Sequence, residues 1–414
     1  MNDNLQITKA EGEGKRNRSL MLSYILEEIY LHRLLNRELI LKECLAPKGV
    51  EEAEGNELID FLLAQEYLEE AWEEKAGTVL FLTENAISRL KREGRRKITI
   101  SAEGLRLDPY LFSHQLSLNR FVYALERAMD GVFSYTYYDL RHLPVTEPNL
   151  WPDGVVELSD CFLFLEMDMG TEKSRDLRIK WNSYKAFLNN HPAYYDKPIV
   201  MAFILSGSAY CTARRHTVLK TAFPEVGEYL SDRFEIYAEG PDAMIPILLK
   251  RLAFCLKGED QGERSMLLAQ PDFYEIEKKS REEYLKPDEK TRGDYTLKAV
   301  IQKGMQKKEV ALILDFWLDN RLSIPEKMNA YTIASAEDET DALPIYLIVV
   351  EDRNQVKREL NQVDCKMGMG IYFLTKKDLS RKDWQERLFQ LKGPVGSRWL
   401  SGCNDFFQRV SAPL

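Results

Sequence analysis

Two acidic side chains, Glu166 and Asp168, lie near the end of the apolar stretch CFLFLEMDM at residues 161–169, and a third, Asp153, lies upstream of it. Side chains of a strand alternate between its two faces, so Glu166 and Asp168 are predicted to leave the end of a strand on the same side. Asp153, in the turn Trp-Pro-Asp-Gly before the neighbouring strand, is predicted to enter from roughly opposite. Two carboxylates about 4 Å apart repel by roughly 4 kcal/mol at an effective dielectric of about 20. Three converging acids therefore need something that neutralises them.

Three kinds of partner would neutralise these acids. A divalent cation with oxygen ligands, Mg²⁺ or Mn²⁺, would be held by Asp153, Glu166 and Asp168. A raised pKa on one carboxyl group, or an adjacent Lys or Arg, would also remove the repulsion. The alternative to a functional interpretation is that the acids are solvated at the strand end and that Asp153 only forms a turn.

The elements that would position these acids follow in the order helix, three strands, helix and strand, within a core predicted over residues 105–257. The last of these strands is apolar on both faces and is predicted to be central in a sheet. The predicted helices are 113–131 and 171–190, and the predicted strands are 132–140, 155–158, 161–168 and 196–207. A helix from about residue 211, a strand at 233–239 and a helix at 240–256 complete the core.

The N-terminal part of the chain has a different pattern. Residues 1–18 are polar and are predicted to be disordered. Residues 19–98 show three helical segments, a two-stranded hairpin with Gly77 at its turn, and a closing helix that begins after Thr83 as N-cap. This order predicts a winged helix-turn-helix.

The charge of this module argues against simple DNA docking. Between Lys48 and Lys75, a stretch that includes the expected recognition helix, ten acids stand against two bases. DNA phosphates would repel such a face. The basic run Lys91–Lys97 is the expected phosphate contact, although a solvated helix end is equally consistent with it. The module is therefore predicted to contact either DNA or a protein partner, which includes a second copy of the chain. The predicted nucleic-acid contacts are Lys91, Arg92, Arg95, Arg96, Lys97 and Arg141.

The whole chain has 414 residues and a formal charge of −9, which is compatible with two or three domains. Its six cysteines form no C-x-x-C pair, so we expect reduced thiols and a cytoplasmic protein, with no zinc site. No stretch has the length and apolarity of a signal peptide or a membrane span. No P-loop or G-x-S-x-G motif occurs, and the five histidines lack metal-ligand spacing. His114, at the start of a predicted helix, is expected to cap or pack.

The C-terminal third is predicted to be a separate α/β unit. Residues 258–292 are rich in charge and are expected to form a linker before a unit at 293–414. A long helix over about 296–320 is predicted to open this unit. A strand, a helix and a strand at PIYLIVVE, NQVKRELNQV and GIYFLT follow it.

The combination of a Pro-Asp turn, a Glu-x-Asp strand end and a Lys-bearing helix resembles the PD-(D/E)XK nuclease superfamily. The predicted αβββαβ order is that of its restriction-endonuclease-like core. The segments HQLSLNRF, PDG, FLEMDMGTE and LRIKWNSY are more specifically similar to the replication-relaxation family of bacterial plasmids and mobile elements, over roughly residues 20–255. That resemblance implies a winged helix joined to a nuclease-like core in an α+β or α/β multidomain protein.

The resemblance also implies roles for individual residues. Asp153 and Glu166 would be catalytic and would hold Mg²⁺ or Mn²⁺, with Asp168 as a third ligand. The lysine of the superfamily motif is replaced by Asp168, so Lys180 on the next helix would stabilise charge on the phosphate. A lysine at the border of that helix, with its head in water, is the ordinary alternative. Thr171 and Tyr184 would be supporting contacts.

The expected function is metal-dependent hydrolysis of a DNA phosphodiester bond, as in a magnesium-dependent endonuclease. A DNA-binding replication or regulatory factor that retains the fold without catalysis is the first alternative. A protein-interaction adaptor that uses the acidic winged helix is the second. Metal affinity separates the nuclease from both alternatives, and salt-dependent DNA binding separates the alternatives from each other.

Overall fold

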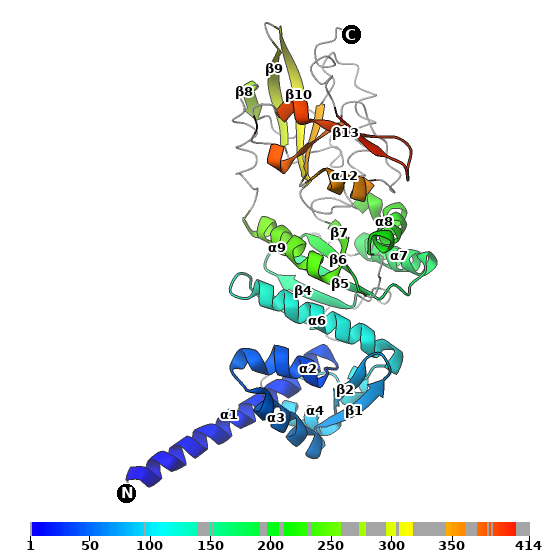
Figure 1. The fold of residues 1–414 in the computed structure, drawn as a ribbon. Coiled ribbons are helices and arrows are strands. Elements are labelled where there is room, and N and C mark those ends of the chain that lie inside the picture. The colour runs from blue at the N-terminus through cyan, green and yellow to red at the C-terminus, as the bar shows by residue number, and fades with distance from the viewer. Residues whose placement is uncertain are drawn as a thin grey trace. The chain divides into compact units, whose positions relative to one another are not determined.

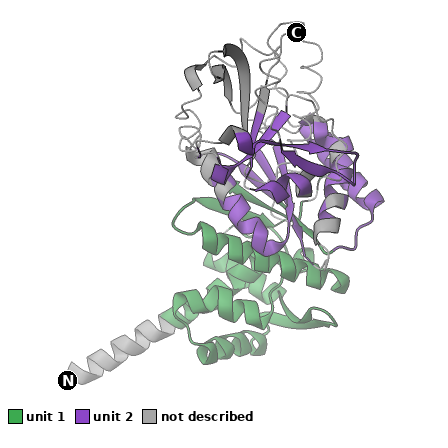
Figure 2. Ribbon diagram, turned by 45° about the horizontal axis from the view of Figure 1, so that its top comes forward, with its two compact units in different colours: residues 1–159, 165–169 green, residues 160–164, 170–414 purple. Residues whose placement is uncertain are grey.

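A computed structural model shows a mixed α+β protein, in which the described residues form three sheets (Figure 1). The chain divides into two compact units (Figure 2). The first comprises residues 1–159 and 165–169, and the second comprises residues 160–164 and 170–414. The structure describes residues 2–94, 97–139, 150, 152–190, 197–206, 211–229, 234–257, 273–278, 295–303, 306–317, 345–350, 352–360, 371–378, 381 and 384–402.

The first unit begins with helices and a two-stranded sheet, in the order that the sequence predicts. Strands β1 and β2 pair antiparallel, and Gly77 at their turn has a φ of +71°, which a side chain would strain. The hydroxyl of Thr83 accepts a hydrogen bond from the backbone N–H of Ala86 and caps α4. The elements are α1 (Asn2–His32), α2 (Arg37–Leu39) with a π-helical turn (Ile40–Leu45), α3 (Glu52–Ala64), β1 (Leu68–Glu73), β2 (Gly77–Leu82) and α4 (Glu84–Glu93).

Two features of this region differ from the sequence-based predictions. Helix α1 extends back to Asn2, where the polar composition predicts disorder for residues 1–18. The hydrophobic core also does not end near residue 98. Phe112, Leu116 and Tyr123 of α6 (Phe112–Met129) pack in the same core as the side chains of α1 and α3. The expected domain boundary between 98 and 105 therefore runs through one continuous core, and the division into units falls inside β5 instead.

Five strands form the central sheet, in the order β3-β4-β5-β6-β7. Strands β3 and β4 pair antiparallel, with Tyr137 opposite Val156, whereas β6 and β7 are parallel. All seven side chains of β6 are buried, as its apolar sequence predicts. The elements are β3 (Tyr135–Asp139), β4 (Gly154–Leu158), β5 (Phe162–Asp168), α7 (Ser174–Asn190), β6 (Ile199–Leu205), α8 (Cys211–Val226), β7 (Phe234–Glu239) and α9 (Pro241–Lys257). The predicted order of helix, three strands, helix and strand is present.

A seven-stranded sheet lies in the C-terminal part, in the order β14-β13-β12-β11-β10-β9-β8. The predicted long helix over 296–320 is wrong, because β9 and β10 form an antiparallel pair there, with Tyr295 opposite Leu314. The predicted β-α-β pattern is present, with β11 and β12 parallel. The elements are β8 (Phe273–Lys278), β9 (Tyr295–Lys303), β10 (Gln306–Trp317), β11 (Ile345–Val350), α12 (Arg353–Leu360), β12 (Ile371–Thr375), β13 (Phe389–Lys392) and β14 (Trp399–Gly402). Apart from β8, the expected linker 258–292 lies outside the described residues.

Candidate functional site

Asp153 is placed by the turn that leads into β4. Its Oδ2 atom accepts a hydrogen bond of 2.7 Å from the backbone N–H of Met167 in β5. The next residue, Gly154, lies under the ring of Tyr137, where a Cβ atom would come within 2.9 Å of the ring. The two residues of the turn therefore have separate roles. Asp153 holds the end of β5 by a hydrogen bond, and Gly154 leaves room for the ring of Tyr137.

Glu166 and Asp168 stand on either side of Met167 and are both buried, with 1% and 2% of their surfaces exposed. Because alternate residues of a strand share a face, the two side chains leave β5 on the same side. The hydrogen bond from Met167 to Asp153 brings the third acid to this strand end. The three acids that the sequence singles out thus belong to one small region of the first unit.

His114, near the start of α6, also belongs to this region. Its Nε2 atom lies 3.2 Å from Oδ2 of Asp153 and 2.9 Å from the backbone oxygen of Met167. A protonated imidazole there would offset the charge of Asp153. From the sequence, His114 is expected only to cap or pack. The signal that pointed to it is its place at the start of HQLSLNRF, one of the segments that carry the family resemblance.

The described residues contain no group of three or more His, Cys, Asp or Glu side chains arranged to hold a metal ion. Oδ2 of Asp153 accepts the hydrogen bond of the Met167 amide and lies beside His114. As placed, Asp153, Glu166 and Asp168 do not fit the expected Mg²⁺ or Mn²⁺ site. The neighbour of Asp153 that the structure shows is a histidine, His114, and not the Lys or Arg that the sequence predicts as one alternative.

Lys180, Thr171 and Tyr184 belong to the second unit. Nζ of Lys180 lies 3.1 Å from Oε1 of Glu172, and it stands over the ring of Phe203 at 5.4 Å from the ring centre. Tyr184 is buried and packs against the rings of Phe164 and Trp181, which gives it a role in the core. Thr171 is exposed.

A second buried polar group lies in the first unit and joins its N-terminal helices to α6 and β3. Arg33, which follows α1 and has a φ of +66°, donates from Nε to the backbone oxygen of Leu105 and lies 3.8 Å from the carboxylate of Asp139. Gln115 donates to the other oxygen of Asp139 at 3.4 Å. Asn119 donates to the backbone oxygens of His32 and Leu34, so α6 is fixed to the end of α1 by polar as well as apolar contacts.

Tyr123 is at the centre of a third cluster in the same unit. Its hydroxyl donates to Glu28 at 2.9 Å and lies 3.3 Å from Sγ of Cys44. Burial raises the pKa of the Cys44 thiol well above its usual range, so Cys44 is an unreactive core thiol. Burial and the neighbouring Glu28 raise the pKa of Glu126 to about 7. The pKa values of Tyr24, Tyr135 and Tyr137 are also raised, chiefly because of burial, and the charge of Glu126 contributes to each shift.

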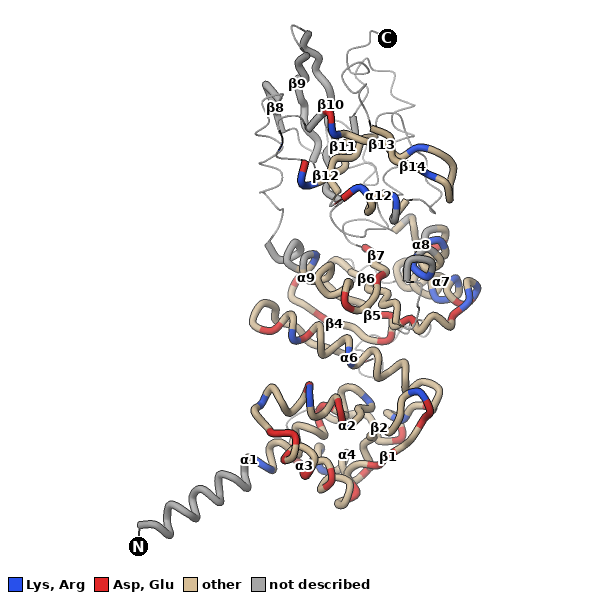
Figure 3. The backbone as a smooth tube through the Cα atoms, viewed as in Figure 1, with Lys and Arg blue, Asp and Glu red and all other residues tan. Residues whose placement is uncertain are grey.

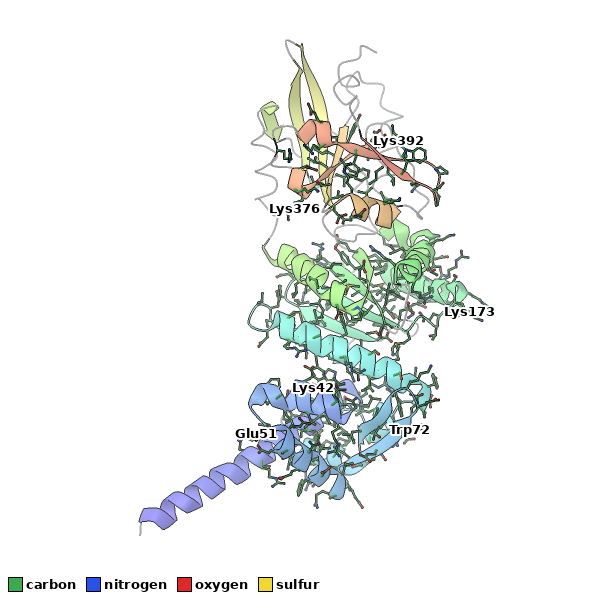
Figure 4. The ribbon with its side chains drawn as sticks, in the orientation of Figure 1. Lys42, Glu51, Trp72, Lys173, Lys376 and Lys392 are labelled. Carbon is green, nitrogen blue, oxygen red and sulfur yellow. The ribbon has the colours of Figure 1, made fainter. Side chains whose placement is uncertain are left out.

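The predicted nucleic-acid contacts in the N-terminal region are described only in part. Lys91, Arg92 and Lys97 are exposed, whereas Arg95, Arg96 and Arg141 lie outside the described residues. The acids of α3 and β1 are mostly exposed, and Trp72 in β1 exposes 68% of its surface (Figure 4). The face that a winged helix would turn toward DNA is therefore acidic in the structure as well as in the sequence.

Comparison with known proteins provides no relative: no family model, no curated protein and no solved structure matches the chain. No described helix is long and apolar enough to cross a membrane.

Proposed function

We propose that the chain is a DNA-acting protein of a plasmid or mobile element, with an N-terminal winged helix-turn-helix and a nuclease-like core. The family resemblance of the quoted segments supports this proposal. The structural observation that carries it is the hydrogen bond from Met167 to Asp153, which brings the Pro-Asp turn to the Glu-x-Asp strand end. The αβββαβ order of the elements is consistent with the same core.

DNA binding without catalysis is the version that the described geometry supports best. In this version, Asp153 and His114 hold β4, β5 and α6 together, and the chain acts as a replication or regulatory factor. The acids as placed do not form a three-ligand metal group, so we derive no metal-dependent step. The second candidate is the metal-dependent endonuclease. The burial of two carboxylates, Glu166 and Asp168, at one strand end favours it, since buried charge is costly and is common at functional sites.

A cleavage assay separates these two versions. The purified chain is incubated with supercoiled and with linear DNA, in Mn²⁺, in Mg²⁺ and in EDTA. The non-catalytic version predicts DNA that is shifted in a gel but stays intact in every condition. Cleavage that requires the metal and is lost in Glu166→Gln would establish the endonuclease instead. Failure to shift or to cleave DNA would reject both.

The N-terminal module suits a protein partner better than DNA. Its exposed acids would repel phosphate, whereas they would attract a basic protein surface. Exposed tryptophan is costly on a free surface and is enriched at protein interfaces, so Trp72 supports the same role. If the module mediates self-association, sedimentation equilibrium will show a dimer that Trp72→Ala weakens. If the chain sediments as a monomer at all concentrations, self-association is excluded and the partner must be a different protein.

A further inference from the structure

Helix α7 has two distinct faces. One face is buried and carries the core side chains Leu177, Trp181, Tyr184, Phe187 and Leu188. A second face, beside the buried one, carries Arg175, Arg178, Asn182 and Lys185 at the spacing i, i+3, i+7 and i+10, which places them in one row. Arg175, Arg178 and Asn182 are exposed, and Lys185 is half-buried. Every side chain of this row is a hydrogen-bond donor, and none is an acid.

The charge of α7 contrasts with that of the rest of the chain. From Lys173 to Asn190 there are five bases and one acid, in a protein whose net charge is −9 (Figure 3). The single acid, Asp176, accepts a hydrogen bond from the backbone N–H of Lys173 at 3.1 Å. An acid in the first turn of a helix often accepts such a hydrogen bond, so Asp176 caps the start of α7.

Neighbouring residues extend the positive charge of α7. Helix α8 packs beside α7, where Nε1 of Trp181 donates to the hydroxyl of Thr221 at 3.1 Å. Arg214 of α8 donates to the backbone oxygen of Glu172 at 2.7 Å, just before α7 begins. Lys220 of α8 and Lys173, which is labelled in Figure 4, are exposed. Acids are sparse on this helix pair. Asp176 is the one acid within Lys173–Asn190, and Glu225 is the one acid within Cys211–Val226.

We propose that the exposed row of α7, Arg175-Arg178-Asn182-Lys185, binds the phosphate backbone of duplex DNA. The proposal rests on the proposed function and names the contact surface within it. The row spans ten residues, or about 15 Å of helix. Phosphates follow one another every ~3.4 Å of axis on each DNA strand, so the row is long enough to meet several of them. The planar guanidinium groups of Arg175 and Arg178 suit bidentate binding of phosphate.

This surface replaces the basic run Lys91–Lys97 as the principal DNA contact. The run lies in the N-terminal module, where α3 and β1 present exposed acids. The row on α7 itself contains no acid, and its two arginines are exposed, so it attracts phosphate. Contacts to phosphate carry no sequence information, so α7 is expected to position DNA rather than to select a sequence.

The test compares two triple variants of the full chain that change the net charge equally. One variant carries Arg175→Gln, Arg178→Gln and Lys185→Gln. The matched control carries Lys91→Gln, Arg92→Gln and Lys97→Gln. Glutamine keeps helix propensity, and circular dichroism with thermal melting verifies that each variant is folded. Affinity for a fluorescent duplex is measured by anisotropy over a range of KCl concentrations, with vesicles of anionic lipid as a separate arm.

The inference predicts that the α7 variant loses at least about tenfold in affinity, and that its log–log salt slope falls by about 2–3. The control is expected to stay within about threefold of the wild type. Equal losses in both variants, or a larger loss in the control, would overturn the assignment of α7 while leaving DNA binding intact. Absence of DNA binding by the wild type would reject the proposed function itself. Binding to the vesicles and not to DNA would reject both.

Discussion

The carboxylate of Asp153 accepts a hydrogen bond from the backbone N–H of Met167, the residue between Glu166 and Asp168. Asp153→Ala would leave this donor without its acceptor, and the expected loss in free energy of unfolding is about 1–3 kcal/mol. Asp153→Asn keeps an acceptor oxygen, so we expect a clearly smaller loss. Urea denaturation of both variants at neutral pH measures the difference. Equal losses would mean that the hydrogen bond does not stabilise the fold.

Asp139 balances the buried charge of Arg33, whose Nε lies 3.8 Å from the carboxylate. Asp139→Ala would leave a buried cation without that charge, and the expected cost is about 3–5 kcal/mol. Replacing both residues, as in Arg33→Met with Asp139→Leu, is expected to cost less than the single change at Asp139. A double-mutant cycle in urea, with Arg33→Met and Asp139→Leu as its single variants, gives the coupling between the two residues. Additive losses would show that the two charges do not interact.

Glu126 is expected to make the stability of the chain depend on pH. Its pKa is about 7 in the folded chain, against 4.5 for an ordinary glutamate. Below pH 4.5 the group is protonated in both states. As the pH rises toward 7, the unfolded chain releases the proton that the folded chain retains, so the stabilising contribution of the group is lost.

Glu126→Gln removes this titration, because an amide does not ionise. Relative to the variant, the wild type is expected to lose about 1–3 kcal/mol of stability between about pH 4.5 and pH 8. Urea denaturation at these two pH values measures the change. A constant difference between wild type and variant across this range would show that the carboxyl of Glu126 titrates normally.

Lys180 is expected to contribute less to DNA binding than Arg178, although both lie on α7. The Nζ atom of Lys180 lies 3.1 Å from Glu172, so a local acid offsets its charge. Lys180→Gln should therefore lower the salt slope of DNA binding by less than Arg178→Gln, for which a decrease of about 1 is expected. Anisotropy titrations of the two single variants make the comparison. A larger effect at Lys180 would instead favour its role near the reacting phosphate.

The strand that carries Glu166 and Asp168 was predictable from the sequence, because it depends on local periodicity. The alternation in CFLFLEMDM predicts that Glu166 and Asp168 share a face, and the buried pattern of β5 agrees with a strand. The role of His114 was not predictable in the same way. Its contacts are with residues 39 and 53 positions further along the chain, and a single histidine at the start of a helix gives no periodic signal.

The two larger errors have separate physical causes. The segment 296–320 has apolar residues at spacings that suit a helix, but pairing in the sheet decides its structure, with β10 hydrogen-bonded between β9 and β11. The domain boundary was placed after the closing helix of the predicted winged helix-turn-helix, near residue 98. The apolar residues of α6 that complete the N-terminal core, such as Phe112 and Leu116, come after that boundary and were assigned to the next domain.

The dependence of DNA affinity on salt tests the central claim most directly. The full chain is titrated onto a fluorescent duplex at KCl concentrations between about 50 and 200 mM. A phosphate contact made by the row on α7 predicts affinity in the micromolar range or tighter at the lower salt. It also predicts a log–log slope of about −3 to −5. No binding at about 100 µM protein in about 50 mM salt, or an affinity that does not change with salt, would contradict the account.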